Sequence, residues 1–241
     1  MTAVQSKGTA MSSHGSSQPQ MPFNTLPPVV VAMCLLIMGI EVAFNLGARG
    51  ILGGAQGVGW RLSALQQFAF APQQLWWMIE TWQFPFDLAK RPLTYAFVQG
   101  NFTQAIFVCV FLLAMGKMVA EAMGEVAMLL IFVASAIGGA LVYGFVVSGE
   151  TPLIGGFPAV YGLIGGFTHI LWRKLGQVGA QQSRAFSMIA FLMGFQLLFG
   201  LLFGGNYDWI ADLAGFATGF LLSFFVAPGG LRRIRDRMRH E

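Results

Sequence analysis

The sequence contains few charged residues. Only 10% of its 241 residues are Asp, Glu, Lys or Arg, whereas 56% are hydrophobic. Soluble globular domains carry about 25% charged residues, so this composition indicates an integral membrane protein whose immediate surroundings are the lipid bilayer. The formal charge of +4 comes from short basic clusters beside apolar runs, and it does not indicate a nucleic-acid partner.

Cysteine and histidine are scarce as well. Cys34 and Cys109 both lie within apolar runs and lack the spacing of a metal site, so they are expected to be ordinary buried side chains. The only histidines are His14, His169 and His240. Nothing in the sequence indicates a metal ion or another cofactor.

Long apolar runs separated by polar turns predict an all-α membrane protein with six transmembrane helices, because a spanning helix needs roughly 20 apolar residues. The expected spans cover residues 28–46, 102–118, 127–147, 159–172, 186–204 and 209–226. They make residues 28–228 a single transmembrane domain. Residues 1–27, rich in Ser, Gln and Pro, are expected to be a disordered cytoplasmic tail. The basic residues 229–241 are expected to anchor the last span at anionic lipid.

Residues 47–101 are too long for a turn and too often interrupted by Gly and Pro for a span. They are predicted to form amphipathic pieces in the membrane interface, where aromatic side chains are favoured. The aromatic residues concerned are Trp60, Phe68, Phe70, Trp76, Trp77, Trp82 and Phe84. In the first span, Glu41 and Asn45 interrupt the apolar run. Glu41 is expected to face either protein or water, because a charge in hydrocarbon is costly.

Lys and Arg are distributed unequally between the two sides of a six-span chain. The termini and the turns after spans two and four hold ten of them, namely Lys7, Lys117, Arg173, Lys174, Arg184, Arg232, Arg233, Arg235, Arg237 and Arg239. The opposite side holds Arg49, Arg61, Lys90 and Arg91. The positive-inside rule therefore predicts that both termini are cytoplasmic.

The stretch from Thr151 to Trp172 runs from a segment rich in Gly and Pro directly into an apolar helix. A non-helical segment at membrane depth must satisfy its backbone inside the protein, so a re-entrant loop at the floor of a cavity is expected. Its core, Gly-Phe-Pro-Ala-Val-Tyr-Gly-Leu at 156–163, resembles the active-site stretch Gly-x-Ser-Gly-x-x-Tyr of the rhomboid intramembrane proteases. The resemblance extends from about Arg91 to Val226. It implies a six-helix rhomboid fold in a membrane, with the bacterial inner membrane as the expected location.

The resemblance also shows that the catalytic groups of the family are replaced. Phe157 stands in place of the nucleophilic serine, and Pro158, which has no N–H, in place of the next glycine. Asp212 replaces the basic histidine of the last span. In the second span, Gln99 and Gln104 replace two histidines and Val108 replaces an asparagine. No catalytic residue is therefore assigned.

No histidine elsewhere restores the dyad. His169 is twelve residues past Phe157, about 18 Å along a helix at 1.5 Å per residue. It is expected to be an interfacial residue at the cytoplasmic end of the fourth span. Candidate cavity or binding residues are Asp212, Tyr161, Gln104 and Glu41, with Asp212 expected to accept from Tyr161 or Gln104 or to belong to a structural polar network. Gly162, Gly165, Gly215 and Gly219 are expected to let helices pack closely.

Three functions remain open. The first is a rhomboid-like pseudoprotease, not an enzyme, that binds membrane-protein clients through their transmembrane segments. The second is an active rhomboid-type serine endopeptidase with an unrecognised nucleophile, for which Ser148 and Thr168 are the hydroxyls to test. The third is a transport component that uses Glu41 and Asp212 as a polar path. The lack of an inverted repeat argues against the third.

Overall fold

The computed structural model describes residues 26–149, 151–203 and 207–227, and within these ranges the chain is helical apart from short connections and one isolated β-bridge. The prediction of an all-α membrane protein is confirmed at this level. The predicted tails, residues 1–27 and 229–241, lie outside the described ranges except for Leu26 and Pro27.

Six long helices fall on the six apolar runs. They are α1 (Pro28–Ala48), α7 (Phe102–Met123), α8 (Glu125–Val146), α9 (Phe157–Gln177), α10 (Ser187–Phe203) and α11 (Asp208–Val226). Among the described residues, α1, α7, α8 and α11 are long and apolar enough to cross a membrane. The helix α10 has only 17 residues, and α9 carries Arg173 and Lys174 near its end. The fourth predicted span, residues 159–172, is too short, since α9 runs from Phe157 to Gln177 and has 21 residues.

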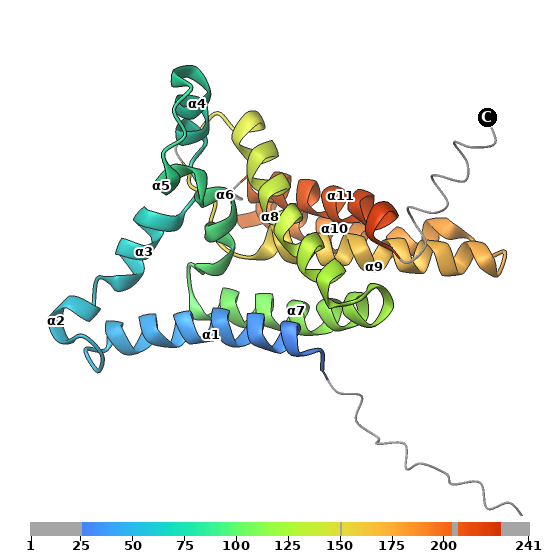
Figure 1. The fold of residues 1–241 in the computed structure, drawn as a ribbon, viewed down its shortest axis with the longest axis horizontal. Helices are drawn as coiled ribbons and strands as arrows, with labels where there is room; N and C mark the ends of the chain where they lie inside the picture. Colours follow the sequence, from blue (N-terminus) through green and yellow to red (C-terminus); the bar gives the residue numbers. More distant parts are fainter. Residues whose placement is uncertain (1–25, 150, 204–206, 228–241) are drawn as a thin grey trace, which may run out of the picture.

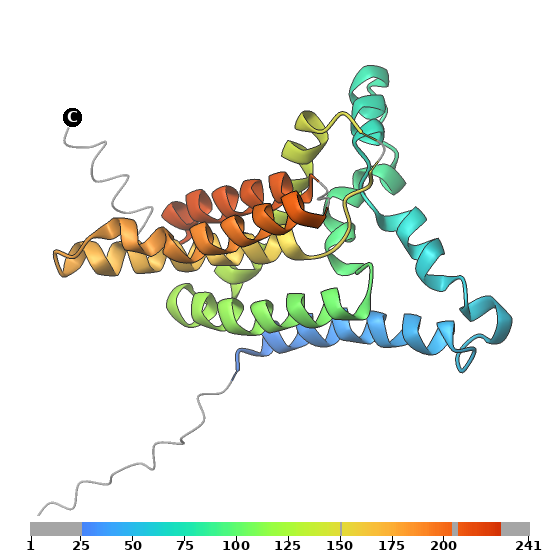
Figure 2. The same cartoon turned by 180° about the vertical axis from the view of Figure 1, so that it is seen from behind.

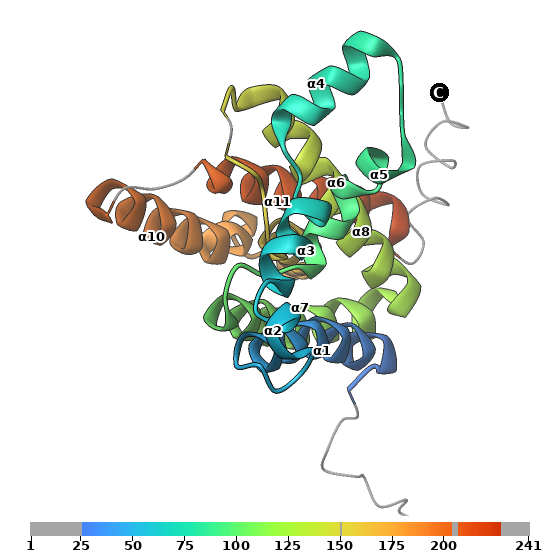
Figure 3. The same ribbon diagram turned by 90° about the vertical axis from the view of Figure 1, so that its left-hand side faces the viewer.

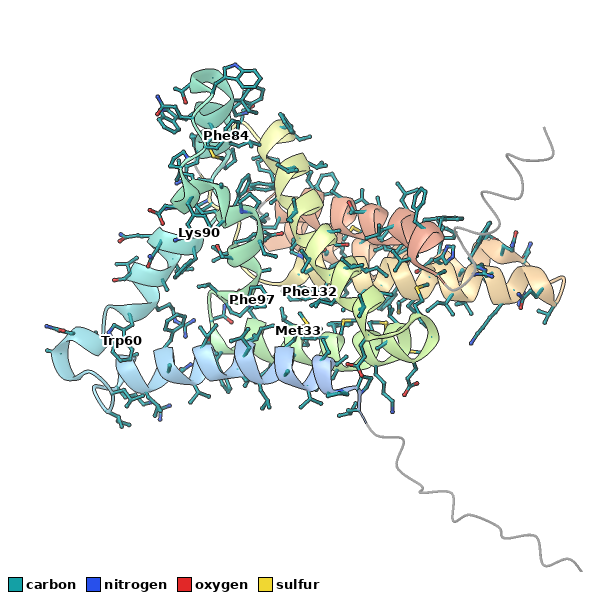
Figure 4. All side chains as sticks on the ribbon, in the orientation of Figure 1. Met33, Trp60, Phe84, Lys90, Phe97 and Phe132 are labelled. Carbon is teal, nitrogen blue, oxygen red and sulfur yellow. The ribbon has the colours of Figure 1, made fainter. Side chains whose placement is uncertain are left out.

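The segment between α1 and α7 consists of short helical pieces. These are α2 (Gly54–Gly57), α3 (Trp60–Phe68), α4 (Pro72–Thr81), α5 (Phe86–Ala89), α6 (Arg91–Thr94) and the 3-10 turn η1 (Tyr95–Phe97). Figure 1 shows α2 to α5 along one edge of the molecule, and the side chains of Trp60 and Phe84 lie on this edge in Figure 4. Most of its aromatic side chains are at least partly exposed, with Trp82 at 82%, as expected for an interfacial segment.

Phe70 departs from that prediction. It is only 1% exposed and belongs to the hydrophobic core. Its backbone forms the β-bridge with Leu153, in which each N–H donates to the other residue's carbonyl at 3.1 and 2.7 Å. Phe70 is buried because its backbone pairs with the segment before α9. The sequence of residues 47–101 alone does not indicate this partner.

Local sequence explains where the main helices begin and end. Pro28 occupies the first turn of α1, where a missing N–H costs nothing. Asn101 caps α7 by accepting from the N–H of Gln104 at 2.8 Å, and Gly124, with φ +97°, ends that helix. Pro158 lies in the first turn of α9. These signals place the turn between α7 and α8 and the start of α9 without reference to tertiary contacts.

The long helices form two groups that share one core. The helix α11 packs mainly against α9 and α8, and α1 packs against α7, which also contacts α9 and α8. Figures 1 and 2 show α9 and α11 running side by side, with α1 and α7 below them. At the centre, the rings of Phe97 and Phe132 lie 5.9 Å apart, and both side chains point inward in Figure 4.

The helix α10 is attached differently from the others. It contacts α11 and the 3-10 turn η2 (Gln182–Phe186) only sparsely, whereas α9 and α11 share a long interface. Figure 3 shows α10 standing away from the bundle. A helix with so few packing partners is the one that can separate from the bundle at the lowest cost.

Candidate functional site

The segment from Thr151 to Gly156 enters the protein without forming a helix, and the protein satisfies much of its backbone. Tyr143 donates its hydroxyl to the carbonyl of Thr151 at 3.1 Å, and Gly155 donates its N–H to the carbonyl of Tyr95 at 3.1 Å. The bridge between Leu153 and Phe70 satisfies two further groups. Such internal pairing is what a non-helical segment at membrane depth requires.

Gln99, Gln104 and Val108, the three residues in the replaced positions of the second apolar run, lie around the turn before α9. The N–H of Gly156 donates to Oε1 of Gln99 at 3.2 Å. A Cβ on Gly155 would collide with the amide of Gln104, and one on Gly156 would lie 2.9 Å from Val108 Cγ1. Gly155 also has φ +94°, a conformation that favours glycine. The side chains from the start of α7 therefore meet the turn.

Phe157 and Pro158 form the first turn of α9. The ring of Phe157 is partly buried and packs against the hydrophobic core. Pro158 lies between two neighbouring helices, because a Cβ on Gly139 of α8 would fall 2.8 Å from Pro158 Cβ and one on Gly215 of α11 would strike the Pro158 carbonyl. The first turn thus offers a ring and an imino acid, and neither supplies a nucleophile.

Glycines allow α9 and α11 to pack in close contact. A Cβ on Gly219 would collide with the carbonyl of Gly162, and a Cβ on Gly165 would collide with that of Phe216. A Cβ on Gly162 would collide with the hydroxyl of Ser135 in α8. Backbones at this distance leave no room for any other residue type.

Asp212 is joined to α10 and α9 by a chain of side-chain hydrogen bonds. Nε2 of Gln196 donates to Oδ2 of Asp212 at 2.8 Å, and the hydroxyl of Tyr161 donates to Oε1 of Gln196 at 3.1 Å. Asp212 is 2% exposed, and its Oδ1 has no hydrogen-bond partner among the described residues. These hydrogen bonds connect the three helices α9, α10 and α11 through one side chain from each.

Of the two alternatives for Asp212, the structure agrees with the polar network and not with a direct hydrogen bond from Tyr161 or Gln104. Gln196 stands between Tyr161 and Asp212, and Oε1 of Gln104 accepts from the N–H of Gly100 at 2.9 Å. Sequence reasoning missed Gln196. It was detectable as the one amide side chain within the apolar run 186–204.

Glu41 belongs to a separate polar group. It is fully buried, and Arg61 of α3 pairs with both of its oxygens, at 3.0 Å to Oε2 and 2.6 Å to Oε1. Asn45 donates to Oε1 at 2.8 Å, and Arg61 also donates to the carbonyl of Gln99 at 2.9 Å. Glu41 therefore faces protein, not water, and it ties the interfacial segment to α1.

His169 lies deeper than the predicted interfacial position. It is 1% exposed, and its ring packs against Phe220, Phe224 and Trp172 at centroid distances of 5.8, 4.3 and 6.3 Å. Neither ring nitrogen has a hydrogen-bond partner among the described residues. Among these residues, no group of three or more His, Cys, Asp or Glu is arranged to hold a metal ion.

These features define an integral membrane protein built as a helical bundle, with a backbone segment that enters between α8 and α9. Residues 89–229 match the family model of the Rhomboid domain. This match spans more than half of the chain, and the protein belongs to the rhomboid family. No curated protein matches the chain.

Proposed function

We propose that this member of the rhomboid family is catalytically inactive and binds other integral membrane proteins through their transmembrane segments. In this proposal all six long helices cross the membrane, the segment before α9 is a re-entrant loop, and both termini are cytoplasmic. The bacterial inner membrane is the proposed location. The observation that carries the proposal is the pair Phe157 and Pro158 at the start of α9.

Serine hydrolysis requires a hydroxyl, a base that takes its proton and N–H donors for the oxyanion. Phe157 has no hydroxyl, and Pro158 has no N–H to donate. The N–H of Gly156 is already engaged by Gln99. The turn is therefore occupied by groups that satisfy one another, which supports a structural role over a catalytic one.

The remaining polar chain supports binding. The helix α10 has few packing partners, and Gln196 holds it to Asp212 and Tyr161. The same helix exposes Phe191, Leu197 and Leu198 on an apolar surface. A transmembrane helix of a client can pack along this surface, and separation of α10 from the bundle would give the client access to the buried, unpartnered Oδ1 of Asp212, since polar side chains join helices in membranes.

Labelling with a fluorophosphonate tests the inactive assignment. We expect no labelling of the wild-type chain anywhere in residues 151–172 and no cleavage of a transmembrane substrate. A variant with Phe157→Ser, Pro158→Gly and Asp212→His reintroduces the missing groups and shows whether the scaffold can be activated. Labelling or cleavage by the wild type that is lost in the double variant Ser148→Ala and Thr168→Val would overturn the proposal.

Capture of client helices tests the binding function. A photoreactive residue at Leu198, which is 53% exposed, is expected to crosslink to membrane proteins in native membranes. The variant Asp212→Ala is expected to lose the strongest crosslinks, whereas the matched control Gly194→Ala, on an open part of α10, is expected to retain them. Equal crosslinking in Asp212→Ala and wild type would remove Asp212 from the binding site.

Cysteine accessibility tests the number of spans. In the Cys34→Ala, Cys109→Ala background, single cysteines are placed at Gly124, Ser148 and Gly179. With six spans, Gly124 and Gly179 share the cytoplasmic side and Ser148 is outside. If α9 and α10 do not cross, the cysteine at position 179 will react from the same side as the one at position 148.

A further inference from the structure

A hollow of about 350 Å³ lies at the end of the molecule opposite the re-entrant loop. Its walls come from the end of α7, the last turns of α9 and Ala227 just past α11. Figure 1 shows these three helix ends on the same side of the protein. The polar side chains in the lining are His169, Arg173, Lys174 and Gln177, all from α9.

The hollow is positively charged. Arg173 and Lys174 line it, and neither forms a salt bridge with another described residue. The described lining contains no carboxylate. Glu121 lines a smaller adjoining hollow of about 260 Å³, which also includes Lys174, and it lies 3.8 Å from the amine of Lys117. Two cations therefore face this space without a counter-charge in its wall.

His169 supplies the second observation. Its side chain lines the hollow, yet it is 1% exposed and both ring nitrogens lack a hydrogen-bond partner among the described residues. Buried polar groups are nearly always hydrogen-bonded, and one left unpaired carries its full desolvation cost. A basic flank at a helix end is common in membrane proteins, but such a flank does not explain an unpaired imidazole beneath it.

We propose that this hollow binds the phosphate group of an anionic phospholipid from the adjacent leaflet. Arg173 and Lys174 neutralise the phosphate, and a ring N–H of His169, once the ring turns toward the hollow, donates to one of its oxygens. Gln177 is placed to bond the hydroxyl groups of a headgroup such as glycerol. Basic pockets between transmembrane helices recognise lipid headgroups in this way. This assignment does not depend on catalytic activity or on client binding.

Native mass spectrometry of the full chain in lipid nanodiscs tests the proposal. With phosphatidylglycerol mixed into phosphatidylcholine, we expect one phosphatidylglycerol molecule to remain bound after the nanodisc is removed. Arg173→Gln is expected to weaken this retention about five- to tenfold. The matched control Arg184→Gln removes the same charge from the exposed turn η2, outside the hollow, and is expected to change retention by less than about twofold.

The variant His169→Leu tests whether phosphatidylglycerol binds in a specific site or is only attracted by the basic residues nearby. The substitution removes the proposed N–H donor and leaves the basic residues intact, so we expect about tenfold weaker retention. Because it also removes two unpaired buried nitrogens, its thermal stability in lipid-free detergent is expected to equal or exceed that of wild type. Retention of phosphatidylglycerol by His169→Leu and Arg173→Gln at the level of Arg184→Gln would overturn the proposal.

Free phosphate is the alternative source of the same chemistry. Thermal unfolding is measured in detergent with phosphatidylglycerol, with phosphatidylcholine and with inorganic phosphate at matched ionic strength. The lipid assignment predicts a stabilisation by phosphatidylglycerol that is absent in His169→Leu and exceeds that from the other two. If inorganic phosphate stabilises the protein equally, the ligand of the hollow is a soluble anion and the lipid assignment is wrong.

Discussion

Gln196 of α10 donates a hydrogen bond from Nε2 to Oδ2 of Asp212 in α11, with 2.8 Å between the two atoms. This contact lies in the part of the bundle where helix packing is sparsest. Polar contacts between membrane helices contribute on the order of 0.6–2 kcal/mol each. For a helix with few apolar partners, one such contact is a large share of what holds it in place.

The Gln196–Asp212 contact is predicted to control the attachment of α10. Gln196→Ala removes the donor to Asp212 and the acceptor of Tyr161, so α10 should separate more readily. A double-mutant cycle with Asp212→Ala, measured by unfolding in mixed micelles, should give a coupling energy of about 0.5–2 kcal/mol. Tyr161→Phe, which leaves the Gln196–Asp212 bond intact, should destabilise less. Additive effects of the two alanine substitutions would contradict this role.

The Glu41–Arg61 pair is predicted to be the costliest polar contact to break. Arg61→Leu leaves a fully buried carboxylate with Asn45 as its remaining side-chain donor and should lower the free energy of unfolding by about 3 kcal/mol. Adding Glu41→Leu removes the stranded charge and should recover much of that loss. Asp87→Asn breaks the pair with Lys90 at its solvent-exposed partner, whose side chain is 81% exposed, and serves as control, with no measurable change expected. A similar loss in the control and in Arg61→Leu would contradict the distinction.

The long helices were predictable because each apolar run is bounded by proline, glycine or charge. The resemblance drew attention to Gln99, Gln104 and Val108, and in the structure Gln99 accepts from the N–H of Gly156 just before α9. Partners that come from distant parts of the chain were not predictable. Arg61 reaches Glu41 only because α3 folds back over α1, and the donor to Asp212 is Gln196 of α10. No local sequence pattern indicates either contact.

Close packing of α9 against α11 gives a third prediction. Gly219→Ala places a Cβ against the carbonyl of Gly162, a backbone atom that cannot rotate away. Overpacking of this kind should cost about 1–3 kcal/mol in the free energy of unfolding. Gly194→Ala makes the same chemical change where nothing lies within 4 Å, and it should be neutral or slightly stabilising because alanine favours helix. Equal stability of the two variants would show that the helices are farther apart.

The bridge between Phe70 and Leu153 gives a fourth prediction, because it joins the segment between α3 and α4 to the segment before α9. Leu153→Pro removes the N–H that donates to Phe70 at 2.7 Å, and that carbonyl is then left without its partner in the protein. We expect faster proteolysis between α3 and α4, since the bridge residue follows α3 directly.

Leu153→Ile is the control for this experiment, because it keeps the N–H and nearly the same volume at a position that is 1% exposed. Its proteolysis rate should match wild type, and Leu153→Ala should fall between the two because it loses packing but keeps the bridge. If Leu153→Pro and Leu153→Ala are cleaved equally fast, side-chain burial and not the backbone pair holds the segment. The segment before α9 would then depend on its hydrogen bonds with Tyr143 and Tyr95 for its position.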